Sequence, residues 1–344
     1  MKTNANKWIG IALQLLLVAA LTVLAGATRR HVLDAQRQLT ADGSIPFTLE
    51  SALAFRRIQI VYRDGDLPKI DQGIQYPRGV VTRAVDTLGV ERIYARAAKL
   101  WPGTLPLAEK IRWLHLAWFC LAIPGMFFWV KWMGGGAAGG FWAAAFYAVA
   151  ISAVARATGQ ELSHENNALP LLLGHLAAAA WARNRAGSVR ARHVAGWISA
   201  GLAGLALCAW DMVQFYLLLL LGWELAGAIR GRLSKEDLWS RAVPLMAVLV
   251  AAGLRNPYLR AHGFLFSPTL ALWWGLLLAG ATLWILDEPL TGLDVHAVAL
   301  MEGLIRDHLT TGGMVVATTH QALNLEGVKV QRLLVGNVAI PELA

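Results

Sequence analysis

The stretch WIGIALQLLLVAALTVLAGA, from Trp8 to Ala27, is twenty residues long and contains no charged side chain. Because a helix needs about 20 mostly apolar residues to cross a bilayer, this stretch is long enough to span one. Seven further apolar segments follow along the chain, at residues 113–130, 137–155, 168–182, 194–209, 212–229, 242–254 and 268–286. The sequence therefore predicts an α-helical polytopic membrane protein with about eight spans.

The composition of the chain supports this fold class. It is 56% hydrophobic and 15% charged, it contains 15 tryptophans, and its mean hydropathy is +0.48, which is outside the range of ordinary soluble domains. A net charge of +9 would suggest nucleic acid as a partner of a soluble protein. Here much of the excess lies in short loops between apolar segments, where membrane proteins carry their cytoplasmic Lys and Arg. We therefore exclude nucleic acid as a partner.

Short basic loops set the predicted orientation. Four arginines lie between 183 and 192, four basic residues between 230 and 241, and Lys2 and Lys7 precede the first span. If all three regions are cytoplasmic, the protein is multi-pass in a bacterial inner membrane, with its N-terminus and C-terminal tail inside. An alternative for the first span is a cleaved signal peptide, because Ala25-Gly26-Ala27 fits a cleavage site.

This topology divides the chain into four predicted parts. Residues 1–27 form the first span, 28–112 an extracytoplasmic segment, 113–282 a helical bundle and 283–344 a separate tail. The loop at 158–167, the Trp210–Asp211 turn and the loop at 256–267 also face outward. Cys120 and Cys208 lie within predicted spans and form no Cys-x-x-Cys motif, so we interpret them as packing residues.

Two outward-facing stretches carry acidic residues in a readable pattern. In the first stretch, residues 47–58 have the spacing of a helix and residues 76–79 are Tyr-Pro-Arg-Gly. Residues 64–71 between them predict a turn, in which we expect Asp64 and Asp71 to be solvated. In the second stretch, Glu161, His164 and Glu165 would share one face if the segment is helical. Two carboxylates and an imidazole could hold Mn²⁺ or Mg²⁺.

Together these stretches resemble the catalytic subunit of oligosaccharyltransferases, membrane glycosyltransferases of the GT-C type, over residues of about 45–280. Glu50 stands where that family usually has Asp, Arg56 matches, and Tyr76-Pro77-Arg78-Gly79 matches well, whereas the usual aromatic residue after the acid is absent. The resemblance implies transfer of a sugar from a polyprenyl-linked donor. It implies membrane lipid and this polyprenyl-linked sugar as partners. It assigns Mn or Mg to Glu50, Glu161, His164 and Glu165.

The same resemblance gives other residues a role in the transfer. Arg56 and Arg156 are expected to bind the substrate phosphate, and Glu50 to act in catalysis. Asp211 lies between two closely spaced apolar runs, where an ionisable group is a functional candidate by default. We therefore add Asp211 to the predicted catalytic residues.

The tail has a different character. Leu283–Leu286 predict a buried strand whose carboxyl end carries Asp287 and Glu288. A helix is predicted from Val295 to Leu309, and a second strand from Met314 to Ala317 precedes His320.

Asp287-Glu288-Pro289, Asp294 and Thr318-Thr319-His320 resemble the C-terminal fragment of an ABC transporter ATPase, a P-loop NTPase, and most of all the haem-exporter ATP-binding subunit of cytochrome c biogenesis. The resemblance assigns Asp287 to the metal, Glu288 to catalysis, and Asp287, Glu288, Asp294 and His320 to a nucleotide-binding remnant. It implies ABC transporter subunits as partners.

The phosphate-binding half of such a site is absent from the sequence. A phosphate loop ends in Gly-Lys-Ser/Thr, and no Gly-Lys pair occurs among the 344 residues. We expect no ATP hydrolysis from this chain alone, and ATP-Mg as a cofactor only if a partner supplies that loop. Residues 268–286 also cannot serve fully as both the last span and a strand.

Three functions remain open at this stage. The leading hypothesis is a glycosyltransferase-like membrane protein fused to an incomplete, poorly ordered ATPase remnant. The alternatives are an ATP-binding component of a haem exporter and an inactive membrane scaffold.

Overall fold

The structure is a computed structural model that describes residues 2–47, 49–158, 161–183, 188–229, 234–281, 283–310, 313–325, 327–328 and 330–331. It divides into two compact units, Met1–Trp274 and Gly275–Ala344, which are described separately. Residues 332–344, for which the sequence predicts poor order, lie outside the described residues.

The first unit is almost entirely helical. In chain order its elements are α1 (Lys2–Gln38), α2 (Leu49–Asp64), β1 (Ile70–Asp71), β2 (Val80–Val81), α3 (Thr82–Val85), α4 (Gly89–Leu100), α5 (Leu107–Cys120), α6 (Ala122–Val130), η1 (Lys131–Gly135), α7 (Gly136–Val149), α8 (Ile151–Ala155), α9 (His164–Arg183), α10 (Val189–Ala209), α11 (Val213–Ile229), α12 (Lys235–Asp237), η2 (Leu238–Ala242), α13 (Val243–Arg255), α14 (Pro257–Ala261) and η3 (Phe264–Phe266). Helix α15 (Pro268–Ala281) crosses the boundary between the units.

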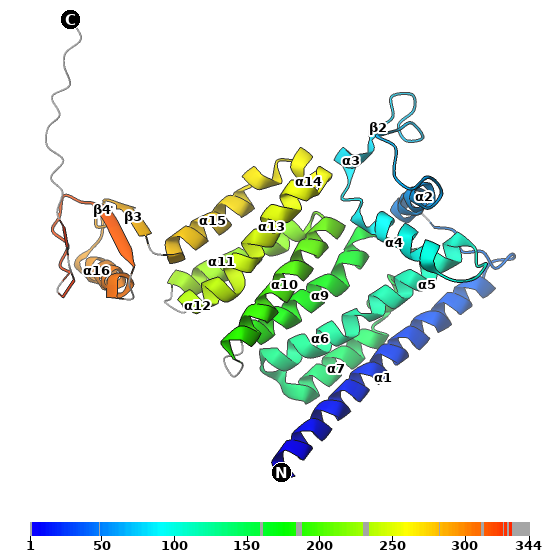
Figure 1. Ribbon diagram of the computed structural model, residues 1–344, viewed down its shortest axis with the longest axis horizontal. Helices are drawn as coiled ribbons and strands as arrows, with labels where there is room; N and C mark the ends of the chain where they lie inside the picture. Colours follow the sequence, from blue (N-terminus) through cyan, green and yellow to red (C-terminus); the bar gives the residue numbers. More distant parts are fainter. Residues whose placement is uncertain are drawn as a thin grey trace, which may run out of the picture. The chain divides into compact units, whose positions relative to one another are not determined.

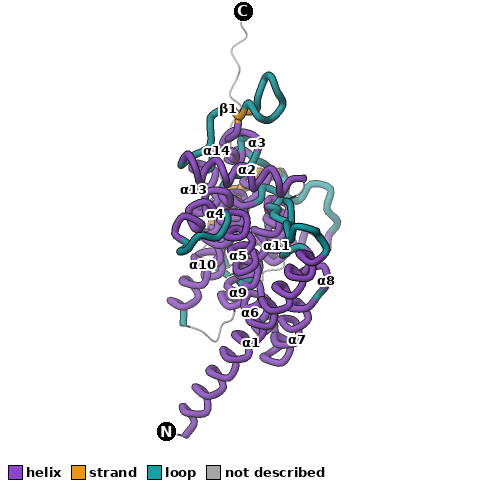
Figure 2. Tube along the Cα trace, turned by 90° about the vertical axis from the view of Figure 1, so that its right-hand side faces the viewer, coloured by secondary structure: helices purple, strands orange, loops and turns teal. Residues whose placement is uncertain are grey.

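The long helices lie side by side as a row of rods (Figure 1). Helix α9 packs against α6 on one side and α10 on the other, α10 continues to α13, and α1 packs on α7. Helices α2 to α4 and the short β1–β2 hairpin gather near the ends of the helices that are far from the N-terminus (Figure 2). The predicted outer segment therefore folds over one end of the bundle.

The first helix is longer than the predicted span. It continues past Ala27 to Gln38, because the added residues include no Gly or Pro to end it. Arg29, on this added part, is fully buried and donates hydrogen bonds to the carbonyl oxygens of Ala25, Ala148 and Ala153 at 3.0, 3.1 and 3.4 Å. The added turns are thus held where α7 ends and α8 begins.

Three stretches are long and apolar enough to cross a membrane, judged by length and composition over the described residues: Trp8–Gln38, Leu107–Val149 and Leu238–Arg255. They support a helical membrane protein, whereas the predicted count of eight spans is not confirmed. Within the second stretch the chain reverses between α6 and α7. Gly134 and Gly136 have φ angles of +108° and +63°, which L side chains rarely adopt, so glycine suits both positions of this turn.

The conflict over residues 268–286 is resolved in favour of a strand. Helix α15 has 14 residues, so it rises roughly 21 Å, less than the hydrocarbon thickness of about 30 Å. The second unit contains β3 (Leu283–Asp287), α16 (Val295–Thr310) and β4 (Met314–Thr318). Strands β3 and β4 pair in parallel, with Leu283 opposite Met314 and Asp287 opposite Thr318.

Candidate functional site

Two predicted acidic stretches meet at the start of α2. The backbone N–H of Leu162 donates to the Ser51 hydroxyl at 2.8 Å, although the two residues are 111 positions apart. Glu50 and Glu161, the neighbours of these two residues, are both exposed. The hydrogen bond therefore joins the segments that carry the first and second predicted acids.

A buried charge cluster lies beside this junction. It consists of Arg57 from α2, Asp86 before α4, Glu91 from α4 and His164 at the start of α9. Arg57 Nη1 lies 2.8 Å from Asp86 Oδ2 and 3.6 Å from Glu91 Oε1, and His164 Nε2 lies 3.2 Å from Glu91 Oε1. Arg57 and Glu91 are only 2% and 1% exposed, so their charges depend on one another rather than on water.

Two of the titratable groups in the charge cluster, His164 and Glu91, have shifted pKa values. Burial acts to lower the pKa of His164, but the hydrogen bond and charge of Glu91, together with Asp86, outweigh it and raise that pKa. For Glu91, burial acts to raise the pKa, whereas the hydrogen bond and charge of His164, with Arg57, lower it overall. The ionised forms of both groups are therefore favoured in the folded state.

These shifts predict how stability depends on pH. The raised pKa of His164 gives stability that is fully present below its unfolded value of about 6.5 and is lost as pH rises through the folded pKa. The lowered pKa of Glu91 gives stability that is present above about pH 4.3 and is lost as pH falls through the folded pKa. We expect His164→Gln to remove the loss of stability at rising pH, as measured by denaturant titrations at several pH values. The matched change at exposed His262 should leave that loss in place.

A second buried network continues the contact between α4 and α9. The Tyr94 hydroxyl donates to Asn167 Oδ1 at 2.5 Å and lies 3.0 Å from His115 Nδ1, while Trp118 Nε1 donates to the Asn167 carbonyl oxygen at 3.0 Å. Burial raises the pKa of Tyr94, so its hydroxyl remains a proton donor. Glu91 and Tyr94 are one turn apart on α4, and their partners His164 and Asn167 are one turn apart on α9. The two helices are thus held in register by paired polar contacts.

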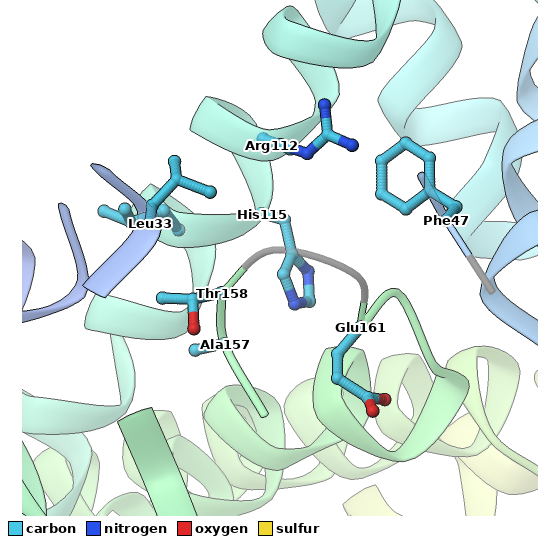
Figure 3. A pocket seen from close by; sticks show the side chains of 8 residues that line it. Leu33, Phe47, Arg112, His115, Ala157, Thr158 and Glu161 are labelled. Atoms are coloured by element: carbon cyan, nitrogen blue, oxygen red, sulfur yellow. The ribbon is translucent and has the colours of Figure 1, made fainter. Parts of the chain in front are cut away.

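A small pocket lies next to this network (Figure 3). Glu161, Thr158 and His115 line it together with Arg112, whose guanidinium lies 4.5 Å from the centre of the Phe47 ring. Arg112 Nη1 also donates to Glu109 at 2.8 Å. The pocket therefore places the predicted acid Glu161 near an arginine that the sequence did not single out.

The two predicted phosphate-binding arginines are each engaged with a carboxylate. Arg56 donates two hydrogen bonds to Asp71, and Arg156 Nη1 lies 2.9 Å from Glu165 Oε1. The expectation that Asp71 is solvated is wrong: it is 3% exposed, because the Arg56 guanidinium and the Gly73 N–H surround its carboxylate. The hydrogen bond from Arg56 lowers the pKa of Asp71 despite its burial.

The assumed helix face for Glu161, His164 and Glu165 is not formed. Helix α9 begins at His164, so Glu161 precedes it, and the three side chains do not follow one helical spacing. His164 faces Glu91, whereas Glu165 faces Arg156. No group of three or more His, Cys, Asp or Glu side chains that could hold a metal occurs among the described residues. The Mn or Mg site at Glu50, Glu161, His164 and Glu165 stays a prediction.

Asp211 lies in the predicted turn between α10 and α11. Its Oδ2 accepts a hydrogen bond from the Tyr258 hydroxyl of α14 at 2.8 Å. Burial, with the hydrogen bond and charge of Asp211, raises the pKa of Tyr258 to about 12. Asp211 thus ties the turn after α10 to α14, and its catalytic role stays a prediction.

In the second unit, the ends of the two strands bring two predicted residues together. Glu288 follows β3 and His320 follows β4, and Glu288 Oε1 lies 2.9 Å from His320 Nε2. Thr291 Oγ1 donates to the other Glu288 oxygen at 2.8 Å. Asp294 Oδ1 accepts from the Ala297 N–H at 2.8 Å, which caps α16. Asp287 ends β3, and its side chain lies outside the described part of the chain.

Comparison with known proteins gives matches to short regions of ATP-binding export proteins. The chain is similar to the cytochrome c biogenesis ATP-binding export protein CcmA of Nitrosospira multiformis, at 59% identity over 58 residues, which is 17% of this chain and 28% of that protein. The same protein of Nitrosomonas europaea matches at 52% over 59 residues, and that of Escherichia coli K12 at 47% over 58 residues, each again 17% of this chain and 28% of the relative.

These matches cover only a small part of this chain and of each relative. The chain spans about a quarter of the length of the curated relatives it matches. No protein-family profile matches the chain. A short region of this chain is therefore similar to ATP-binding export proteins, and the resemblance to oligosaccharyltransferases is not shown by these comparisons.

Sequence reasoning missed most of the buried polar residues. Arg57, Asp86, Glu91, Tyr94, His115 and Asn167 were not predicted as site residues. One signal was present for part of this set: Val90, Glu91, Tyr94, Ala95 and Ala98 are all buried and follow helical spacing along α4. A carboxylate on such a buried face predicts a paired charge.

Proposed function

We propose that the second unit is one half of an ATP site of the ABC type, which works only with a polypeptide that supplies the phosphate loop. The 2.9 Å contact between Glu288 Oε1 and His320 Nε2 carries this proposal. It joins a strand-end acid and a strand-end histidine of two parallel neighbours, and such strand ends are where α/β folds bind ligands.

The chemistry of the two groups fits hydrolysis of a phosphate anhydride. A carboxylate at this position would orient the attacking water, and the histidine at the end of the neighbouring strand would contact the terminal phosphate. Asp287 would hold Mg²⁺. The similarity of a short region to ATP-binding export proteins supports this proposal, and export linked to cytochrome c biogenesis, with ABC transporter subunits as partners, follows from the same similarity.

A binding experiment tests the proposal. The full chain, purified in detergent, is mixed with the phosphate-loop portion of the Nitrosospira relative, and a fluorescent Mg-ATP analogue is titrated. We expect binding by the mixture and none by the chain alone, because the chain has no Gly-Lys pair for the phosphates. His320→Ala should weaken this binding, whereas the same change at exposed His296 of α16 should not. Binding by the chain alone, or no binding by the mixture, contradicts the proposal.

A second candidate function belongs to the first unit. We propose that the helical unit acts on a lipid-linked sugar in a bacterial inner membrane, with its N-terminus and tail cytoplasmic. The hydrogen bond between Leu162 and Ser51 favours this candidate, because it joins the segments of Glu50 and Glu161 at one end of the bundle. Two carboxylates at one site can bind and orient a sugar acceptor and its leaving group.

Binding of a polyprenyl-pyrophosphate sugar in lipid nanodiscs, with Mn²⁺ or Mg²⁺ present, tests the second candidate. We expect Glu50→Ala to abolish binding. Exposed Asp42, whose carboxylate accepts hydrogen bonds from Ser44, gives the matched control Asp42→Ala, which should bind normally. If the unaltered chain binds no lipid-linked sugar in either metal, the first unit is a membrane scaffold instead.

A further inference from the structure

The turn that follows β3 holds the backbone of Glu288 in an uncommon conformation. Its φ angle is +44°, a left-handed value that residues other than glycine rarely adopt. The Glu288 N–H donates to the carbonyl oxygen of Thr318 at 2.9 Å, and the Thr291 N–H donates to the Glu288 carbonyl oxygen at 3.0 Å. Leu290, which is only 2% exposed, anchors the same turn. Such a conformation persists only where its surroundings fix it, and it is typical of functional sites.

The side chain of Glu288 is held at both of its oxygens. Oε1 lies 2.9 Å from His320 Nε2, and Oε2 accepts a hydrogen bond from the Thr291 hydroxyl at 2.8 Å. The backbone bond and the hydroxyl bond of Thr291 therefore both end on Glu288. The Glu288 side chain is 40% exposed, so without these contacts it would be free to rotate in water.

Free rotation of this carboxylate would matter for the chemistry proposed for the second unit. A group that orients an attacking water must keep one oxygen aimed at it, and a misplacement of about 1 Å can lower a rate about a hundredfold. With Oε2 turned toward the Thr291 hydroxyl, Oε1 remains on the side of His320. The Thr291 hydroxyl thus selects which oxygen of Glu288 faces the histidine.

We propose that Thr291 is a positioning residue, which holds the Glu288 carboxylate in the orientation that ATP hydrolysis requires. This inference rests on the proposed ATP half-site and adds a residue that acts through Glu288 rather than on the nucleotide. Loss of the hydroxyl should therefore slow the chemical step without weakening nucleotide binding. A hydroxyl that only stabilised the turn would instead affect binding and rate together.

Hydrolysis by the full chain, complemented with the phosphate-loop portion of the Nitrosospira relative, tests the inference. Thr291→Val keeps the shape of the side chain and removes the hydroxyl. We expect kcat to fall about tenfold, with KM and binding of the Mg-ATP analogue unchanged, because the phosphate contacts come from the supplied loop. Thr291→Ser restores the hydroxyl and should recover most of the rate. The matched control is Thr310→Val, which removes an exposed hydroxyl at the last residue of α16 and should leave kcat unchanged.

A double variant separates positioning from a structural role. In the Glu288→Gln background, Thr291→Val should lower the rate no further, because the carboxylate that it orients is already gone. Three results would overturn the inference and leave the ATP half-site in place: an unchanged kcat in Thr291→Val, no recovery in Thr291→Ser, or a loss of rate matched by weaker analogue binding. If the unaltered mixture neither binds nor hydrolyses ATP, the proposed function fails and this inference fails with it.

Discussion

Replacing Arg57 by Met is expected to lower the free energy of unfolding of the first unit by about 3–5 kcal/mol. The side chain is 2% exposed and faces Asp86 at 2.8 Å and Glu91 at 3.6 Å. Removing one partner of a buried ion pair leaves the other charge without compensation, which costs far more than the lost contact itself. Methionine retains most of the buried apolar volume, so the effect reports the charge.

The matched control lies on the same helix. Arg63 pairs with Asp64, and its side chain is 77% exposed, so Arg63→Met should leave denaturant titrations of the detergent-solubilised chain unchanged within error. Adding Glu91→Gln to Arg57→Met removes one of the two carboxylates that lose their arginine partner, and should recover part of the loss. An Arg57→Met variant as stable as the Arg63→Met variant would show that the charge cluster does not hold α2, α4 and α9 together.

Glu288→Gln is expected to slow ATP hydrolysis by the complemented second unit about a hundredfold or more. The amide keeps the size of the side chain and its contact with the Thr291 hydroxyl, but it cannot accept a proton from the attacking water. Nucleotide binding should be retained, because phosphate contacts come from the supplied loop. Steady-state hydrolysis and analogue binding, measured on the same samples, separate these two effects. Equal rates for Glu288→Gln and the unaltered chain would remove Glu288 from the chemistry.

Local patterns in the sequence predicted the elements that local forces determine. The spacing of residues 47–58 predicted α2, and the four apolar residues before Asp287 predicted β3. In each case the residues next to one another in the sequence determine the local structure. The similarity of a short region to ATP-binding export proteins supports the interpretation of the tail.

Contacts between distant segments could not be predicted in the same way. Three different helices supply Arg57, Glu91 and His164. The residue pattern of one helix does not show which charged side chain of another helix it will contact. Helix α9 begins at His164 rather than before Glu161, which separates Glu161 from the two residues that an assumed helix had placed on the same face. Asp71 was expected in water because turn carboxylates usually are, but Arg56 from the preceding helix covers it.

We propose that Glu288 and His320 act together on one nucleotide, and a double-mutant cycle tests this most directly. ATP hydrolysis by the complemented full chain is measured for Glu288→Gln, His320→Ala and the double variant. Because the two side chains are in contact at 2.9 Å, we predict that the double variant is no slower than the slower single variant. Losses that multiply in the double variant would contradict a shared site.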